Sequence, residues 1–146
     1  MGIAKSNKGL CRVYFPEEAP FDSALKRDFP DFLFVKDDTS CTDIKKQIEE
    51  YFSGKRTSFE LELDLQCPPF YKKALKEVNK IPFGKTVSYR DIAERAGNSK
   101  AVRATGSANA NNPLPIVIPC HRILNTGGYG GNLERKVYLL ELEGSI

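Results

Sequence analysis

The sequence predicts an α+β protein, in which a small N-terminal lobe of β-sheet and helix packs on a mainly helical C-terminal domain with a helix-turn-helix. Three observations support this fold class. Segments with strand-like alternation come before residue 66, apolar residues at helical spacing dominate after it, and the double proline Pro68-Pro69 separates the two patterns. We therefore expect an N-terminal lobe of residues 1–65 and a C-terminal domain of residues 66–146.

Short β-like runs occur in the N-terminal lobe, LCRVYF at residues 10–15 and FLFV at residues 32–35. The last segment of the lobe, FELELDL at residues 59–65, alternates strictly between apolar and acidic side chains. This alternation predicts an edge strand or an extended strap with its leucines on one side.

A helix is predicted between these strands, in SCTDIKKQIEEYFSG. Ser40 or Thr42 can cap its start and Gly54 can end it. Its apolar residues form one stripe: Ile44, Ile48, Tyr51 and Phe52.

The C-terminal domain begins with a predicted helix in PPFYKKALKEVNKIPFG, whose apolar residues are Phe70, Ala74, Leu75, Val78 and Ile81. Two short helices follow around the sequence AGNS. Ser88 and Asp91 form a capping box for the first, Gly97 ends it, and Ser99 is expected to start the second. Two short helices joined by a glycine-containing turn are typical of a helix-turn-helix, although an ordinary helical hairpin has the same pattern.

The second of these helices has an unusual surface. It carries one long cation, Arg103, among small residues: Ala101, Ala104, Gly106, Ser107 and Ala108. A helix that reads base edges in the major groove normally carries several Asn, Gln or Arg side chains. Small residues favour close backbone approach instead, as a minor groove requires, and they also serve tight helix packing.

Charge and cysteine content narrow the function classes. Residues 1–65 hold ten Lys and Arg against thirteen Asp and Glu, whereas residues 66–146 hold twelve against six, so the basic C-terminal part is the better place for a polyanion. One histidine and four widely spaced cysteines give no basis for a metal site or a disulfide framework. No apolar run approaches the length of a membrane helix, and we expect an intracellular protein, cytoplasmic or, in a eukaryote, nuclear.

The run PIVIPCHRIL, residues 115–124, places Cys120 beside the single histidine, His121. Its prolines predict a short extended segment at 116–118, so that adjacent side chains point to opposite faces. His121 can then act on Cys120 only through a bridging water, or directly if the chain bends at Pro119-Cys120. His121 and Arg122 both favour a thiolate at Cys120.

The energetics indicate what such a site must do. With an unperturbed pKa of ~8.5, only about 3% of a cysteine is thiolate at pH 7, so complete ionisation gains ~30-fold, or roughly 2 kcal/mol. Holding an electrophile in line with the sulfur is worth up to ~7–11 kcal/mol. Placement of the substrate is therefore the main task of the site.

Several motifs together resemble the O6-methylguanine-DNA methyltransferase family. They are NPLPIVIPCHRI at 112–123, IPFGKTVSY at 81–89, AVRATGSAN at 101–109, and YGGNLERK and LELEG near the C-terminal end. The resemblance covers nearly all of the chain after Cys67, and residues 1–65 match only in general plan. It implies direct repair of double-stranded DNA that contains O6-alkylguanine, by a monomer that needs no cofactor, metal or membrane.

The resemblance also implies roles for individual residues. Cys120 is the nucleophile that takes the alkyl group, His121 acts on it through a water, and Glu143 orients the imidazole. Asn112 braces the turn that carries the cysteine. Tyr89 lies beside the substrate guanine, on the DNA-binding side, and helps to protonate it.

The remaining implied roles concern DNA and the substrate pocket. Arg103 fills the gap left by the flipped nucleotide, with Ala104 and Gly106 against the minor groove. The substrate pocket is implied to include Tyr129, Gly130 and Ile123. Gly130 stands where many relatives have a serine, which removes one donor to guanine O6 and leaves the range of alkyl groups open.

Three other functions remain possible from the sequence. An alkyltransferase-like protein that flags damaged bases without transfer typically has a tryptophan in place of the cysteine, whereas this chain has Cys120 and no Trp. A cysteine hydrolase needs an oxyanion site and direct contact between cysteine and histidine, which the prolines disfavour. A helix-turn-helix regulator should carry more base-reading side chains than this second helix does.

Overall fold

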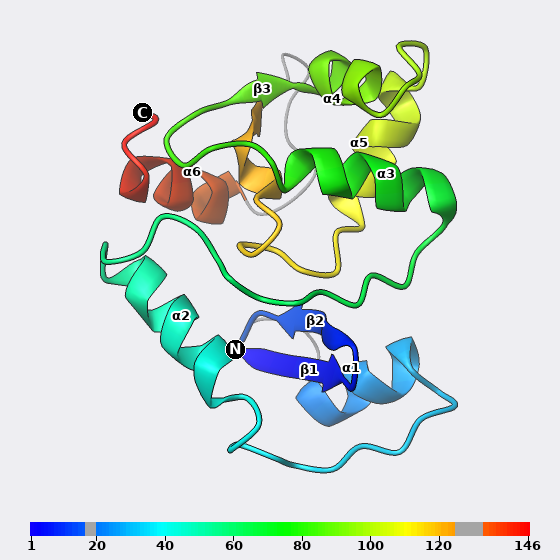
Figure 1. Ribbon diagram of the computed structural model, residues 1–146, viewed down its shortest axis with the longest axis vertical. Helices are drawn as coiled ribbons and strands as arrows, with labels where there is room; N and C mark the ends of the chain where they lie inside the picture. Colours follow the sequence, from blue (N-terminus) through cyan, green and yellow to red (C-terminus); the bar gives the residue numbers. More distant parts are fainter. Residues whose placement is uncertain (17–19, 125–132) are drawn as a thin grey trace. The chain divides into compact units, whose positions relative to one another are not determined.

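The computed structural model of the chain describes residues 1–16, 20–124 and 133–146 (Figure 1). They form two compact units, one of residues 1–56 and 60–65 and the other of residues 57–59 and 66–146. Among the described residues, no helix has both the length and the apolar character that a membrane span requires.

The first unit is built on an antiparallel hairpin of β1 (Gly2–Ser6) and β2 (Gly9–Tyr14). β2 confirms the predicted strand at 10–15, whereas β1 was missed because GIAKS has little apolar alternation. The segment 59–65 forms a strap rather than a full strand. A single bridge joins Leu63 to Leu10, where the amide of Leu10 donates to the carbonyl of Glu62 at 2.9 Å and the amide of Asp64 donates to the carbonyl of Leu10 at 2.8 Å.

Two helices complete the first unit. α1 (Phe21–Asp28) was not predicted, because prolines and acidic residues surround a segment whose buried positions are only Ala24 and Leu25. The phenol of Tyr14 donates to Asp28 at 2.6 Å and so ties the end of α1 to β2. α2 (Thr42–Phe52) is the predicted helix, and it buries Ile44, Ile48 and Tyr51.

The predicted N-cap of α2 is wrong, whereas its predicted end is confirmed. Its N-cap is Cys41, without a side-chain hydrogen bond to the helix. Ser40 and Thr42 instead bond to the preceding turn: the hydroxyl of Ser40 donates to the carbonyl of Asp37 at 3.3 Å, and that of Thr42 to the carbonyl of Asp38 at 3.2 Å. Gly54, at φ +78°, follows the end of the helix as predicted.

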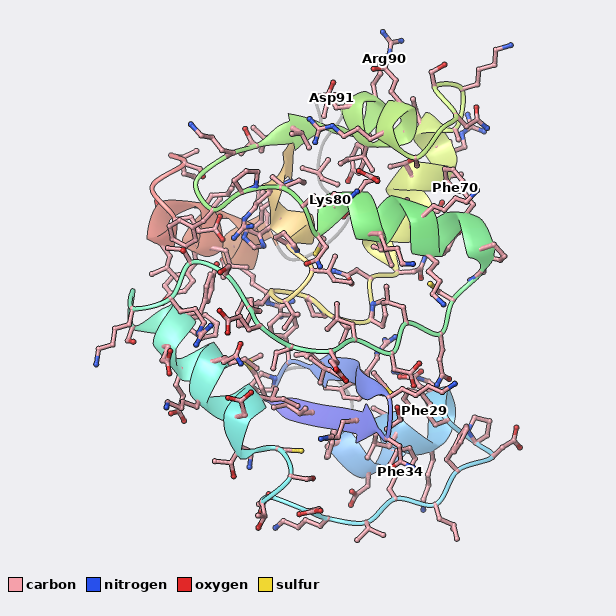
Figure 2. All side chains as sticks on the ribbon, viewed as in Figure 1. Phe29, Phe34, Phe70, Lys80, Arg90 and Asp91 are labelled. Atoms are coloured by element: carbon pink, nitrogen blue, oxygen red, sulfur yellow. The ribbon has the colours of Figure 1, made fainter. Side chains whose placement is uncertain are left out.

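The predicted strand at 32–35 is absent. Residues 32–35 are exposed and have no regular secondary structure, with Leu33 fully exposed. Aromatic contacts order the segment instead, since the rings of Phe29 and Phe34 lie edge to face with centroids 5.8 Å apart (Figure 2). A β-rich run forms a strand only where a partner strand supplies hydrogen bonds, and the described part of the chain offers none here.

The second unit is mainly helical. α3 (Pro69–Val78), α4 (Tyr89–Arg95) and α5 (Val102–Ala110) pack against one another (Figure 1). A short parallel pair joins β3 (Val87–Ser88) to β4 (Ile123–Leu124), and the 3₁₀ turn η1 (Cys120–Arg122) packs against α6 (Leu133–Leu142). The apolar stripe predicted for α3 is confirmed at Ala74, Leu75 and Val78.

α4 and α5 form the predicted helix-turn-helix. Ser88 and Asp91 make a complete capping box at the start of α4, and Gly97, at φ +92°, follows its end in a conformation that favours glycine. The start of α5 was predicted wrongly. It begins at Val102 rather than Ser99, because the side chain of Asn98 accepts from the amide of Lys100 at 3.1 Å and holds the intervening residues in a turn.

Candidate active site

A tight turn leads into Cys120, in place of the extended segment that the prolines suggested. The side chain of Asn112 braces this turn from within, because its Nδ2 donates to the carbonyl of Ile118 at 2.9 Å while its Oδ1 accepts from the amide of Leu114 at 2.9 Å. The amide of Ile118 also donates to the carbonyl of Leu114 at 2.8 Å. Ile116 lies inside the turn at φ +74°, a conformation that costs a β-branched residue free energy, so the surrounding contacts must impose it.

A second bend at Pro119 delivers the cysteine. Pro119 has φ −80° and ψ 68°, and the amide of Cys120 donates back to the carbonyl of Ile118 at 2.8 Å, which is an inverse γ-turn. Cys120 then opens the 3₁₀ turn η1. The backbone here is helical rather than extended, so alternation along a strand does not govern the directions of Cys120 and His121.

Behind the cysteine lies a buried charged network of His121, Arg122 and Glu143. Glu143 Oε1 lies 2.7 Å from Nε2 of His121 and accepts from Arg122 at 2.8 Å, and its Oε2 accepts from Nε of Arg122 at 2.9 Å. The guanidinium of Arg122 also donates to the carbonyl of Ile81 at 2.6 Å. Sequence reasoning placed Glu143 beside His121, but it did not identify Arg122 as the cation that holds Glu143.

The network determines which nitrogen of His121 carries the proton. A carboxylate only accepts, so the nitrogen that faces Glu143 must be protonated. Arg122 already balances the charge of Glu143, and a second buried cation would cost desolvation energy, so the imidazole is neutral. Nδ1 is therefore a free acceptor, and it is buried without a hydrogen-bond partner in residues 1–16, 20–124 and 133–146.

The vacant acceptor separates this site from a thiol hydrolase. In such an enzyme the histidine contacts the sulfur directly. Here Nδ1 of His121 has no partner among the described residues, Cys120 included. A water between sulfur and imidazole is the route that remains, because a buried acceptor of this kind needs a donor.

Cys120 itself does not favour the thiolate, contrary to the expectation from its neighbours. Burial raises the pKa of the Cys120 thiol, and this effect outweighs the hydrogen bond from Asn112 and the positive charge of Lys136, both of which lower it. His121, being neutral, contributes no cation. The resting thiol is therefore protonated and protected, and it must lose its proton as part of its reaction.

Sequence reasoning missed Lys136. It lies on α6, is 6% exposed, and its Nζ donates to the carbonyl of Ile123 at 2.7 Å. Burial lowers the pKa of Lys136, whereas the negative charge of the thiolate form of Cys120 raises it. In the sequence, Lys136 lies two helical turns before Glu143. Nothing in the sequence distinguishes it from a lysine on the surface of the helix.

Removing this lysine should make Cys120 a weaker acid. In Lys136→Met the charge that lowers the pKa of Cys120 is gone, so the pH profile of its alkylation should move to higher pH. The measurement is the rate of iodoacetamide labelling at each cysteine, followed by mass spectrometry. Cys67 is the internal control, because its pKa responds to Lys72 and not to Lys136. An unchanged profile for Cys120 would contradict this role.

Tyr89 and Cys120 come from segments that the β3–β4 pair holds together. Val87 pairs with Ile123, so the first residue of α4 lies near the cysteine turn. Asn109 on α5 joins the two, because its Nδ2 lies 3.4 Å from the phenol oxygen of Tyr89 and 3.3 Å from the carbonyl of Cys120. Sequence reasoning did not select Asn109, although a polar residue that disfavours helices, placed inside a helix of small residues, was a usable signal.

The outer face of the helix-turn-helix carries the residues predicted to meet DNA. Arg103 is exposed on α5, and Ala104 and Gly106 are partly exposed. A methyl group built on Gly106 meets no atom within 4 Å, so packing does not require glycine there. Arg90, in the first turn of α4, extends away from the helix (Figure 2).

The predicted pocket residues are only partly described. Ile123 is fully buried in β4, where its carbonyl accepts from Lys136. Tyr129 and Gly130 lie outside the described residues. Within the described ranges, all four cysteines are free thiols, and no group of three or more His, Cys, Asp or Glu side chains could hold a metal ion.

The fold and the site define a helix-turn-helix protein with a cysteine at the start of a 3₁₀ turn and a buried histidine whose Nδ1 has no partner among the described residues. Family models match nearly the whole chain: the 6-O-methylguanine DNA methyltransferase ribonuclease-like domain at residues 1–65 and its DNA binding domain at residues 69–145. The chain therefore belongs to the 6-O-methylguanine DNA methyltransferase family.

Curated relatives carry the name methylated-DNA--protein-cysteine methyltransferase. The protein of Methanosarcina acetivorans is 38% identical over 147 residues, covering 98% of this chain and 90% of the relative. The constitutive enzyme of Bacillus subtilis is 42% identical over 113 residues, covering 74% of this chain and 68% of the relative. For the protein of Mycolicibacterium paratuberculosis, at 45% identity, the match covers 67% of this chain but only 62% of the relative.

Solved structures of related proteins have the same fold. Mycobacterium tuberculosis O6-methylguanine methyltransferase matches with a TM-score of 0.79 at 33% identity, covering 98% of this chain and 91% of that one. Mycobacterium tuberculosis OGT in complex with DNA matches with a TM-score of 0.81 at 33% identity, over 98% and 85% of the two chains.

Proposed function

We propose that this protein repairs DNA by direct reversal, transferring the alkyl group of O6-alkylguanine to Cys120 once per molecule. The observation that carries the proposal is the placement of a protected thiol, backed by the His121 and Glu143 pair, next to a helix-turn-helix with a small-residue face. Family membership supports the same chemistry. Cys120 also speaks against the related function of flagging damage without transfer.

The transfer is a displacement at the alkyl carbon. The sulfur of Cys120 forms a bond to that carbon as the bond from carbon to guanine O6 breaks. The thiol proton passes through a water to Nδ1 of His121, while the proton on Nε2 stays on that nitrogen and remains hydrogen-bonded to the carboxylate of Glu143. The departing guanine takes up a proton on its ring, and the phenol of Tyr89 donates that proton.

The raised pKa of Cys120 suits this order of events. A thiol that stays protonated until the substrate arrives avoids adventitious oxidation and alkylation. Because free thiolate is scarce, rate must come from holding the alkyl carbon in line with the sulfur. Base flipping provides that placement, and it costs less for a damaged, badly paired base.

DNA binding is assigned to α4 and α5. Arg103 occupies the gap left by the flipped nucleotide, while Ala104 and Gly106 face the minor groove. Residues 66–146 carry a net positive charge, and Arg90 is one of the exposed cations. These cations add an affinity for DNA phosphates that depends on salt concentration and not on base sequence.

Gly106 offers a test of this contact surface. Gly106→Ala should raise the free energy of unfolding by about 0.5–1 kcal/mol, because alanine is the better helix former and the added methyl meets open space. The same methyl should weaken DNA binding by roughly 1 kcal/mol through overpacking of the groove. Denaturant titration and fluorescence anisotropy measure the two effects. Since the variant is more stable, weaker binding cannot come from unfolding, and unchanged binding would remove Gly106 from the interface.

The function itself is tested by mass spectrometry after mixing the protein with a duplex that contains one O6-methylguanine. We expect one methyl on Cys120 in the parent, none in Cys120→Ala, and slower transfer in Arg103→Ala. A thioether has no route back by thiol exchange, so each chain should remove a single methyl. Removal of more than one methyl per chain refutes single turnover, and no removal refutes the proposed function.

Two assignments from the sequence follow from this function. Residues 1–65 and 66–146 act as two domains, of which the second carries all the chemistry described above. A protein whose substrate is cellular DNA works inside the cell, in the cytoplasm or, in a eukaryote, in the nucleus.

A further inference from the structure

Asn109 has half of its hydrogen-bonding capacity in use. A carboxamide can donate two hydrogen bonds and accept two. Its Nδ2 lies 3.3 Å from the carbonyl of Cys120 and 3.4 Å from the phenol oxygen of Tyr89, so both donors have partners. Its Oδ1 is buried and has no partner in the described part of the chain, and the residue as a whole is 6% exposed.

The orientation of this carboxamide follows from its neighbours. The carbonyl of Cys120 can only accept, so the atom that faces it must be the NH₂ group. Rotating the amide by half a turn would set oxygen against oxygen. Oδ1 is therefore the vacant atom, and it is an acceptor that needs a donor, because buried polar atoms are almost always hydrogen-bonded.

The position of the vacant acceptor connects it with the substrate. Asn109 touches the backbone of the nucleophile Cys120 on one side and Tyr89 on the other. A base whose O6-alkyl group meets the sulfur of Cys120 must therefore lie near this carboxamide. O6-alkylguanine has lost the proton of N1, so the 2-amino group is the remaining donor on that edge of the ring. Only N1 separates the carbon that bears this amino group from the carbon that bears O6.

We propose that Oδ1 of Asn109 accepts a hydrogen bond from the 2-amino group of the flipped O6-alkylguanine, which makes Asn109 a residue that determines specificity for guanine. The inference rests on the proposed function. Adenine and hypoxanthine lack this amino group, and each leaves the buried oxygen without a donor. A site built around a hydrogen bond rejects an analogue that lacks it, because the polar group of the site is left unpaired.

The test compares two duplexes that differ by one amino group, one with O6-methylguanine and one with O6-methylhypoxanthine. In the parent, we expect single-turnover transfer from the second to be about tenfold slower, as for the loss of one hydrogen bond. In Asn109→Leu both substrates should react slowly and at the same rate, because the acceptor is gone. Asn109→Ala should give the same equal rates, and it carries the comparison should the leucine variant fail to fold.

The matched control is Asn111→Leu. Asn111 follows α5, two residues after Asn109, and is exposed, so its replacement should keep the tenfold preference. Equal rates for the two substrates in the parent overturn the inference, and so does a preference that survives in both Asn109 variants. Absence of transfer from either substrate in the parent refutes the proposed function instead, so the two failures are distinguishable.

Discussion

Replacing Cys120 with serine is expected to abolish methyl transfer while the protein stays folded. The two side chains have nearly the same shape, and the turn braced by Asn112 does not depend on the sulfur. A hydroxyl ionises far less readily than a thiol and is a poorer nucleophile, so we expect a loss on the order of 10⁵-fold or more, as in other enzymes that lose their nucleophile. Single-turnover transfer of an isotopically labelled methyl group measures this, with thermal unfolding as the check on folding.

Cys67→Ser is the matched control. Cys67 is also a half-buried thiol whose pKa is raised by burial, but it lies outside the turn described above. Its serine variant should transfer at the rate of the parent. Transfer that persists in Cys120→Ser, or a methyl found on another residue, would contradict the assignment of the nucleophile.

Replacing Arg122 with methionine is expected to have the largest effect on stability. The substitution removes three hydrogen bonds and leaves the buried carboxylate of Glu143 without its compensating cation. Breaking a buried ion pair from one side typically costs about 3–5 kcal/mol of the free energy of unfolding. Arg122 also fixes the carboxylate that orients His121, so transfer should become slower as well. Denaturant unfolding and the single-turnover rate of transfer measure the two effects.

The double variant Arg122→Met with Glu143→Leu separates stability from catalysis. Replacing a whole buried ion pair with apolar residues is often neutral or stabilising, so much of the lost stability should return. Transfer should remain slow, because nothing then orients His121. If Arg122→Met alone costs less than about 1 kcal/mol, the network does not have the structural importance assigned to it.

Local signals predicted much of the fold. The capping box of Ser88 and Asp91, the helical stripes and the glycine after α4 each reflect contacts within a few residues, which a sequence displays directly. The segment at 32–35 shows the limit, since strand formation depends on a partner from elsewhere in the chain. The left-handed backbone of Ile116 was equally hidden, because the braces supplied by Asn112 override the preference of a β-branched residue.

The candidate site divides in the same way. Cys120 and His121 stand out as a reactive pair in the letters themselves, and the family resemblance added Glu143. Asn109, Arg122 and Lys136 acquire their roles only through burial and through partners that lie 11 to 41 residues away. The sequence also could not predict whether the pKa of Cys120 is raised or lowered, because this depends on whether the effect of desolvation exceeds that of the nearby charge.

The guanidinium of Arg122 joins segments that are far apart in the chain, since it binds the carbonyl of Ile81 and the carboxylate of Glu143 together. Such nonlocal links form late during folding and raise the contact order of the domain. Fraying of α6 would have to break these bonds. The backbone amides of His121 and Glu143 should therefore exchange at close to the rate set by global opening. The contacts that hold the candidate site in place are then the same contacts that make the domain unfold cooperatively.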